Sequence, residues 1–281
     1  MPTPFSHIAL CEQVLASHEL PAASRRILAR QRAAFLFGST APDAGGLAGL
    51  QRAATHFFEV PLRNRRPAHL RLLAQHPVLA RPHQCPADQA AFLAGYLSHL
   101  WLDQLWISIV FQPAFGQPPF GTGFHQRLVE HNLLRAHLDR LDQTALPARL
   151  DDLLLQAEPK HWLPFLTDGD LIAWRDHLAE QVSANGRIRT LEVFADRLGL
   201  STEAFARQLD TPAVIDRILA ERLPAGTLDR FRSWSLAGTL ELVGYYLDDR
   251  IQAAPRTAGP IPASASTNLP AWDSYESHRA L

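Results

Sequence analysis

A histidine and an aspartate lie four positions apart in the most apolar stretch of the chain. His99 and Asp103 interrupt the run AGYLSHLWLDQLWISIVF, residues 94–111. On a helix, positions i and i+4 project from one face, one turn apart. Each group needs a partner, because an unpaired buried charge is strongly destabilising. A shared divalent cation such as Zn²⁺ would satisfy both.

The spacing alone does not decide for a metal, because chance predicts about one His-x-x-x-Asp/Glu match in a chain of this composition. The alternative is a buried pair that satisfies backbone groups. Further metal-type ligands in apolar surroundings favour the metal site. These are His7 in FSHIAL, Asp43 in FGSTAPD and His56 in ATHFFEV.

Helical periodicity dominates the elements that must position these side chains. We expect helices over 6–18, 22–38, 67–76, 86–111, 124–142, 167–182, 190–200, 201–209, 211–223 and 227–251, with loops over 39–50 and 112–123. Alternating strand patterns with hairpin turns are absent. The sequence therefore predicts an all-α, multi-helix domain over residues 1–252. Residues 253–281, rich in Pro, Ala and Ser, are expected to be a disordered tail.

Composition narrows the function classes. Lys and Arg total 27 and Asp and Glu total 28 among 281 residues. This balance argues against a nucleic-acid partner, which usually requires a positive excess. Two cysteines are too few for a disulfide scaffold or a Cys-based zinc site. Neither a secretory signal nor an uninterrupted membrane-spanning run is seen, so we expect a cytoplasmic protein without a transmembrane segment.

Four segments together resemble one known family. PTPFSHIALCEQVL, FLFGSTAPD, THFF and AFLAGYLSHLWLD are similar to segments of the zinc-dependent phospholipase C family, which is related by fold to the S1/P1 nucleases. The resemblance covers roughly residues 2–110 and, more loosely, HNLLRAHLDRLD at 131–142. It implies an all-α phospholipase C/P1 nuclease-type fold with zinc ions held by His and Asp side chains.

The resemblance also implies a ligand set. Asp43, His56, His99 and Asp103 would hold a first metal, and Asp103 would bridge to a second metal that also binds His7. Two divalent ions about 3.5–4 Å apart polarise a phosphoryl oxygen and lower the pKa of a bound water to near 7. A metal-bound hydroxide would be the nucleophile, with Asp43 as the base that takes its proton.

The chain departs from the family at a further metal, which takes His, His and Glu with the last two spaced His-x-x-x-Glu. That spacing is absent here. His125, Glu130, His131 and His137 occupy the region but do not share one helical face. His131 is a candidate substitute ligand. We therefore expect one or two ions, zinc or another divalent metal.

These observations predict a metal-dependent phosphoesterase of the phospholipase C type. It would hydrolyse a phosphodiester or phosphate monoester, with a small phosphate ester or a phospholipid as substrate. The alternative is a non-catalytic helical metal-binding or scaffold protein derived from the same family. The substrate and the oligomeric state are left open by the sequence.

Overall fold

The apolar stretch that carries His99 and Asp103 forms α7 (Ala87–Trp106), which is buried over most of its length. The computed structural model describes residues 1–62, 66–116, 123–183 and 187–251. Asp88 lies in the first turn of α7, as predicted, where a negative charge favours the helix dipole. α7 continues into the π-helix η4 (Ile107–Gly116), which contains Pro113. Helical structure therefore extends five residues beyond the predicted end at 111, and Pro113 lies inside it.

The helices that pack against α7 include α1 (Pro4–Ala16), α3 (Arg32–Gly38), α6 (Ala68–Gln75) and α14 (Thr227–Leu247). The crossing of α3 and α7 is the closest contact. A Cβ at Gly38 would lie 2.0 Å from the carbonyl oxygen of Phe92, and one at Gly95 would lie 2.1 Å from that of Phe35. Only glycine fits at both positions, so these two residues bring the C-terminus of α3 onto the middle of α7.

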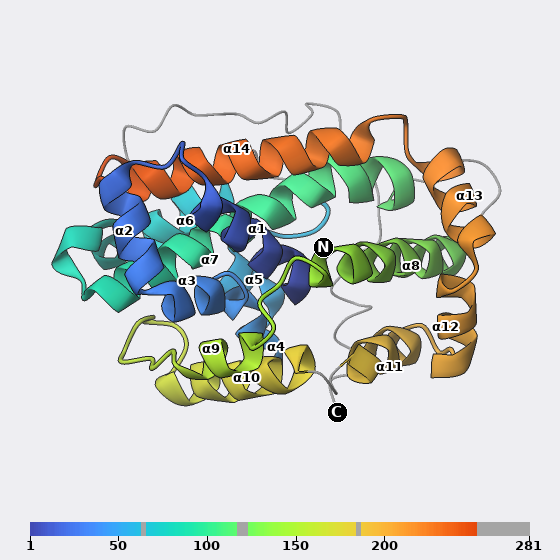
Figure 1. Cartoon of the computed structure of the whole chain (residues 1–281), viewed down its shortest axis with the longest axis horizontal. Helices are drawn as coiled ribbons and strands as arrows, with labels where there is room; N and C mark the ends of the chain where they lie inside the picture. Colours follow the sequence, from blue (N-terminus) through green and yellow to red (C-terminus); the bar gives the residue numbers. More distant parts are fainter. Residues whose placement is uncertain (63–65, 117–122, 184–186, 252–281) are drawn as a thin grey trace.

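The remaining elements surround this centre. Figure 1 shows α14 along one long side of the molecule and α9 and α10 along the opposite side, with α11, α12 and α13 at one end. Their bounds are α2 (Ala22–Arg30), α4 (Ala44–Leu47), α5 (Arg52–His56), α8 (Phe124–Gln143), α9 (Leu150–Leu155), α10 (Asp168–Val182), α11 (Arg187–Arg197), α12 (Thr202–Leu209) and α13 (Pro212–Arg222). Three short 3-10 helices are η1 (Ala41–Asp43), η2 (Pro77–Ala80) and η3 (Pro82–Gln84).

The all-α prediction is confirmed, and the described residues contain no strand. Details differ from the prediction, including the helical residues 112–116 described above and α9, which was not expected. The single helix expected over 22–38 is divided at Gln31, whose φ of −110° and ψ of 36° leave the helical region. The loop expected over 39–50 contains η1 and α4, and α5 follows it. The predicted tail over 253–281 lies outside the described residues.

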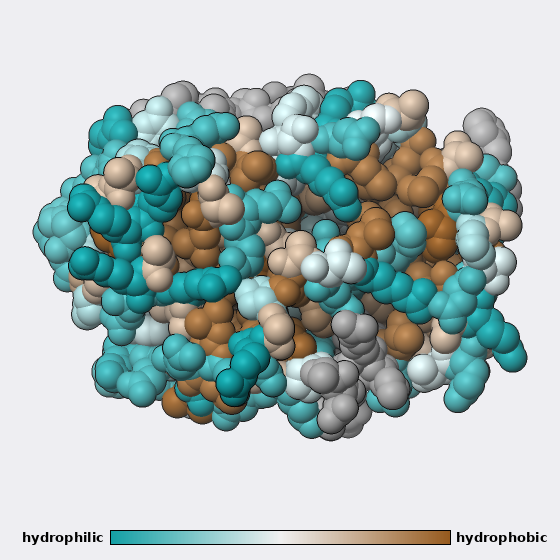
Figure 2. Space-filling view, viewed as in Figure 1, coloured by the Kyte–Doolittle hydropathy of each residue, from teal (hydrophilic) through white to brown (hydrophobic). Residues whose placement is uncertain are grey.

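Among the described residues, no helix is long and apolar enough to cross a membrane. Figure 2 shows hydrophobic and hydrophilic residues interspersed over the face that it presents. The hydrophobic core runs through the centre of the bundle, and the fully buried side chains of α3 and α7 contribute much of it.

Candidate metal centre

Five of the predicted ligands converge beside α7, although they come from four separate elements. His7 lies on α1, Asp43 ends η1, His56 ends α5, and His99 and Asp103 lie on α7. Two groups have all their ligand atoms within 4.8 Å of one another: His7, His99 and Asp103, and Asp43, His56 and His99. His99 belongs to both groups, so the two form one continuous cluster.

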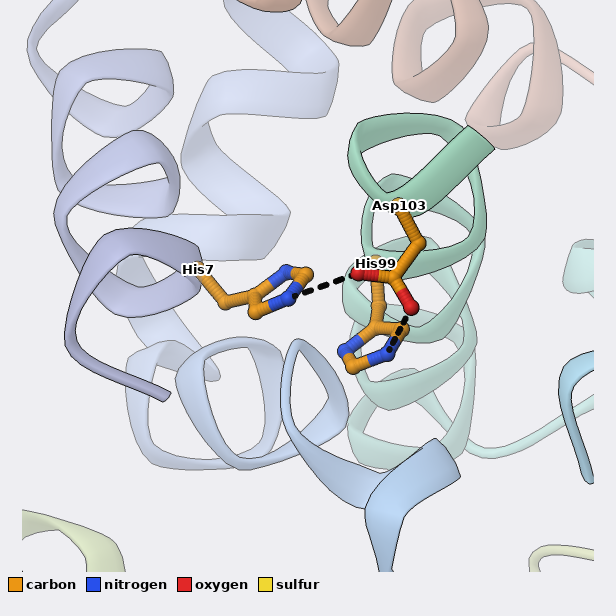
Figure 3. A group of neighbouring side chains, drawn as sticks. All are labelled: His7, His99 and Asp103. Atoms are coloured by element: carbon orange, nitrogen blue, oxygen red, sulfur yellow. Dashed lines mark ion pairs between the residues drawn. The ribbon is translucent and has the colours of Figure 1, made fainter. Parts of the chain in front are cut away.

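The first group is drawn in Figure 3, where His7 reaches from α1 across to the two side chains of α7. His7 Nε2 lies 3.4 Å from Asp103 Oδ1, and His99 Nε2 lies 3.4 Å from Asp103 Oδ2. The rings of His7 and His99 are stacked, with centroids 3.9 Å apart and planes 6° apart. Asp103 therefore offers one carboxylate oxygen to each imidazole.

The second group meets the first at His99, whose Nε2 faces both Asp103 and His56. His56 Nε2 lies 3.2 Å from His99 Nε2 and 3.3 Å from Asp43 Oδ1. It is also 3.7 Å from Asp103 Oδ2, so His56 faces both carboxylates. Asp43 has 29 % of its side chain exposed, whereas the other four side chains are almost fully buried. Asp43 is thus the member of the cluster nearest to solvent.

Hydrogen bonds from Nδ1 orient two of the imidazoles. His99 Nδ1 donates to the carbonyl oxygen of Ser39 at 2.8 Å, since a carbonyl oxygen can only accept. His56 Nδ1 lies 3.1 Å from Thr55 Oγ1, which can accept its proton while donating to the carbonyl of Arg52. In both rings Nε2 is left to face the cluster. Such outer hydrogen bonds are the usual means of orienting metal-binding imidazoles.

The short helix α5 is held in place at its C-terminal end. Tyr96, fully buried on α7, donates its hydroxyl proton to the carbonyl oxygen of Thr55 at 2.5 Å. Phe57 ends α5 in the left-handed region, with φ 59° and ψ 22°, an uncommon conformation for a residue other than glycine. Its buried ring packs edge-on against Phe165. These contacts direct His56 inward.

The electrostatics of the cluster divide the imidazoles into two kinds. Burial lowers the pKa of His7 and of His56 to about 4. Both are therefore neutral near pH 7 and have a free lone pair for a metal. Burial also opposes charge on His99, but the Asp103 carboxylate outweighs it and raises the pKa of His99.

The two carboxylates are held in their charged form. Burial alone would raise the pKa of Asp103, yet the charge of His99 and the close approach of the His7 and His99 rings lower it well below its ordinary value. The pKa of Asp43 is also lowered, because the close contact with His56 and the nearby positive charges of His99 and Arg52 overcome the effect of burial. Both carboxylates therefore stay ionised at neutral pH.

One residue of this site was not predicted from the sequence. Arg52 Nη2 donates to Asp103 Oδ2 at 2.5 Å, and Arg52 Nη1 lies 3.9 Å from Asp43 Oδ1. The available signal was its spacing, since Arg52 is four residues before His56 and both sit on one face of α5. Without a partner, a cation on that apolar segment would be costly, so the spacing pointed to carboxylates nearby.

His131 is the predicted ligand that the structure does not bring into either group. It is buried on α8, where Trp106 Nε1 donates a hydrogen bond to His131 Nε2 at 3.0 Å. Phe111 and Phe115 pack against the same ring. Because an indole N–H can only donate, the Nε2 lone pair is occupied. In this structure His131 therefore contacts Trp106 and lies outside both ligand groups, and its role as a substitute ligand stays a prediction.

The donor set fits a zinc ion. Zinc takes imidazole nitrogen and carboxylate oxygen at about 2.0–2.2 Å, so neighbouring ligand atoms around a tetrahedral ion lie about 3.3 Å apart. The four shortest separations among the five converging ligands are 3.2, 3.3, 3.4 and 3.4 Å. In addition, His7 Nε2 and Asp103 Oδ1 are buried and face each other without a hydrogen bond. A cation between such atoms would satisfy both.

Residues 6–106 match the family model described as zinc dependent phospholipase C. The resemblance to the zinc-dependent phospholipase C family is confirmed. All five converging residues and Arg52 lie within the matched segment, whereas His131 lies beyond it. The part of the chain that builds the candidate metal centre is therefore the part that is similar to the zinc-dependent phospholipase C family. No curated protein and no solved structure matches the chain.

Proposed function

We propose that the protein is a metal-dependent phosphoesterase that hydrolyses a phosphodiester or phosphate monoester at the cluster formed by His7, Asp43, His56, His99 and Asp103. The observation that supports it most directly is the convergence of three imidazoles and two carboxylates at zinc-like separations, inside the segment that matches the phospholipase C family. Small phosphate esters and phospholipids are the proposed substrates. The cytoplasmic location stays a prediction.

A bound divalent ion would supply Lewis acidity toward the phosphoryl group and would make a water molecule more acidic. The protein's own groups then divide the remaining work. The predicted ligands would hold the cation, and all but Asp43 are almost fully buried: His7, Asp43, His56, His99 and Asp103. Asp43, the most exposed of the five, is placed to accept the proton of the attacking water at the solvent side of the cluster.

The test combines elemental analysis with hydrolysis of a generic phosphodiester such as bis(p-nitrophenyl) phosphate. We expect one or two equivalents of zinc or a similar ion in the purified protein, and turnover that a chelator abolishes and added metal restores. His99→Ala combined with Asp103→Ala should lose the metal. Asp43→Asn keeps an oxygen beside the metal and loses the proton acceptor, so with saturating metal activity should still fall by about 10²-fold or more, as for removal of a general base.

A matched control is His69→Ala, which removes a buried imidazole on α6 that belongs to neither ligand group. It should keep the full metal content. Protein without stoichiometric metal, or full metal content in the His99 and Asp103 double variant, would refute the proposal. Stoichiometric metal without turnover of any phosphate ester would instead favour the non-catalytic metal-binding alternative.

A further inference from the structure

Arg52 lies among the residues of the candidate metal centre and carries the same sign of charge as a metal ion. Its guanidinium contacts Asp103 directly and reaches toward Asp43, the two carboxylates of the cluster. The side chain is only 12 % exposed. Because it starts on α5, four residues before His56, it approaches the cluster from the element that also supplies a predicted ligand.

A divalent ion and Arg52 would compete for the same oxygen. Asp103 Oδ2 accepts from Arg52 Nη2 at 2.5 Å and also faces His56 and His99 at 3.7 and 3.4 Å. An ion held by these two imidazoles and that oxygen would lie close to the positive guanidinium of Arg52. Two positive charges that share one carboxylate oxygen repel strongly in a buried site. The guanidinium must therefore move away when the ion binds.

Charge balance indicates what the displaced guanidinium would bind. One divalent ion already neutralises the two carboxylates, so Arg52 would leave one positive charge in excess. A phosphodiester carries one negative charge and two free oxygens. Guanidinium is a planar donor fork that matches phosphate oxygens. Arg52 Nε is buried without a hydrogen-bond partner among the described residues, so part of the fork is available.

A local contact limits how far Arg52 can move. Its guanidinium carbon lies 5.4 Å from the centroid of the Phe58 ring, a cation–π distance. Phe58 is buried and also packs edge-on against His56. The aromatic ring would therefore keep the displaced guanidinium beside the cluster and out of bulk water.

We infer that Arg52 is an internal counter-cation of the metal centre that couples metal loading to phosphodiester binding. In the metal-free protein it pairs with Asp103 and Asp43. On metal loading it is released toward the oxygens of a bound phosphodiester. This inference rests on the proposed function and adds to it a named residue and an anionic substrate of single charge. By thermodynamic linkage, the diester should strengthen metal binding as much as the metal strengthens diester binding.

The experiment measures the Zn²⁺ affinity of the full-length metal-free chain by competition with a chromogenic chelator, with and without saturating dimethyl phosphate. We expect the diester to raise the Zn²⁺ affinity of the wild type by about tenfold. Arg52→Gln should bind Zn²⁺ about tenfold more tightly than wild type without the diester, because the competing charge is gone. Its response to the diester should fall to less than about twofold.

Two further variants complete the test. Arg52→Lys keeps the charge without the donor fork, so it should retain weak Zn²⁺ binding and lose most of the diester response. Arg32→Gln removes a half-exposed arginine that pairs with Glu12, and it should behave as wild type. Circular dichroism checks that each variant is folded. If Arg52→Gln does not fold, the wild type and Arg52→Lys decide the matter by their diester responses.

The Zn²⁺ measurements distinguish failure of the proposed function from failure of the role inferred for Arg52. A wild type that binds no Zn²⁺ would end both the proposed function and this inference. A wild type that binds Zn²⁺, with Arg52→Gln showing an equal or weaker Zn²⁺ affinity or an unchanged diester response, would overturn the role of Arg52 alone. A wild type that binds Zn²⁺ without any diester response would do the same.

Discussion

At the scale of single residues, the cluster depends on supporting groups that are not themselves predicted ligands but hold the ligand side chains in position. The carbonyl of Ser39 accepts from His99 Nδ1, and the hydroxyl of Thr55 lies against His56 Nδ1. Tyr96 in turn donates to the carbonyl of Thr55. Each bond fixes which ring nitrogen faces the cluster. Changes to these supporting groups should therefore affect metal binding even though the ligands are intact.

Tyr96→Phe tests this support. The change leaves the buried carbonyl of Thr55 without its donor, so the free energy of unfolding should fall by about 1–3 kcal/mol. Zn²⁺ affinity should fall by about 10-fold or more, because α5 and His56 are held less firmly. Denaturant unfolding and chelator competition measure the two effects.

The matched control is Tyr246→Phe. Tyr246 is equally buried, and its hydroxyl donates to the carbonyl of Leu79 at 3.1 Å, away from the cluster. Tyr246→Phe should lower the free energy of unfolding by a similar amount and leave Zn²⁺ affinity unchanged. Equal losses of Zn²⁺ affinity in the two variants would show that Tyr96 acts through general stability only.

At the scale of elements, the crossing of α3 and α7 decides whether His99 meets its partner. Gly95 on α7 lies against the carbonyl of Phe35 and the backbone of Gly38 and Ser39. Since Ser39 follows directly after α3, the same close approach brings its carbonyl to His99. The packing of α3 against α7 therefore also sets the orientation of His99, a predicted ligand.

Gly95→Ala should separate the two helices. The new Cβ would lie 2.1 Å from the Phe35 carbonyl oxygen, and backbone cannot move aside as a flexible side chain can. We expect a loss of at least about 1–3 kcal/mol in the free energy of unfolding, the usual cost of overpacking. Metal content should fall as well, because the Ser39 carbonyl would move away from His99.

Gly46→Ala is the control for this prediction. A Cβ there meets nothing within 4 Å, and Gly46 lies in the short helix α4. Its stability should stay within about 0.5–1 kcal/mol of wild type, the helix-propensity difference between the two residues. A Gly95→Ala protein as stable as Gly46→Ala would contradict the packing argument.

At the scale of the whole molecule, the position of His7 depends on how α1 lies on the second half of the chain. Thr3 donates to the carboxylate of Asp139, and Ser6 donates to Asp142 at 2.7 Å. Both acceptors lie on α8. Burial raises the pKa of Asp139 to about 8, although the hydrogen bond from Thr3 and the charge of Arg135 oppose this. This contact makes global stability sensitive to pH.

Thermodynamic linkage gives the direction in which pH changes the free energy of unfolding. A carboxyl group whose pKa is raised on folding binds its proton more tightly in the folded state, so unfolding releases it. For Asp139 the stabilisation is complete below the ordinary pKa of 3.8 and is lost as pH rises to about 8. Asp139→Asn can still accept from Thr3 but does not ionise. Relative to wild type, this variant should therefore become more stable between pH 5 and pH 8.

Urea unfolding of wild type and Asp139→Asn at several pH values tests this prediction. The difference between their free energies of unfolding removes the contribution of titrating groups that both proteins share. Asp176→Asn, at a side chain that is 54 % exposed, is the control and should show a constant difference. A difference between Asp139→Asn and wild type that stays the same from pH 5 to pH 8 would contradict the prediction.

Much of the fold and of the candidate site could be predicted because the deciding signals are local. A period of 3.6 residues identifies helices without knowledge of their neighbours. The placement of His99 and Asp103 on one face follows from helix geometry alone. The types and apolar surroundings of His7, Asp43 and His56 were also visible in the sequence. That a metal binds where these residues meet remains a prediction.

The rest was decided by tertiary structure, because it depends on how segments far apart in the chain approach one another. The crossing at Gly38 and Gly95 brings Ser39 to His99, and no local pattern specifies that distance. The same packing places Arg52 on Asp103 and encloses His131 among aromatic rings. Sequence by itself determined which residue types were available for chemistry, and the packing of helices determined which of them meet and in what charge balance.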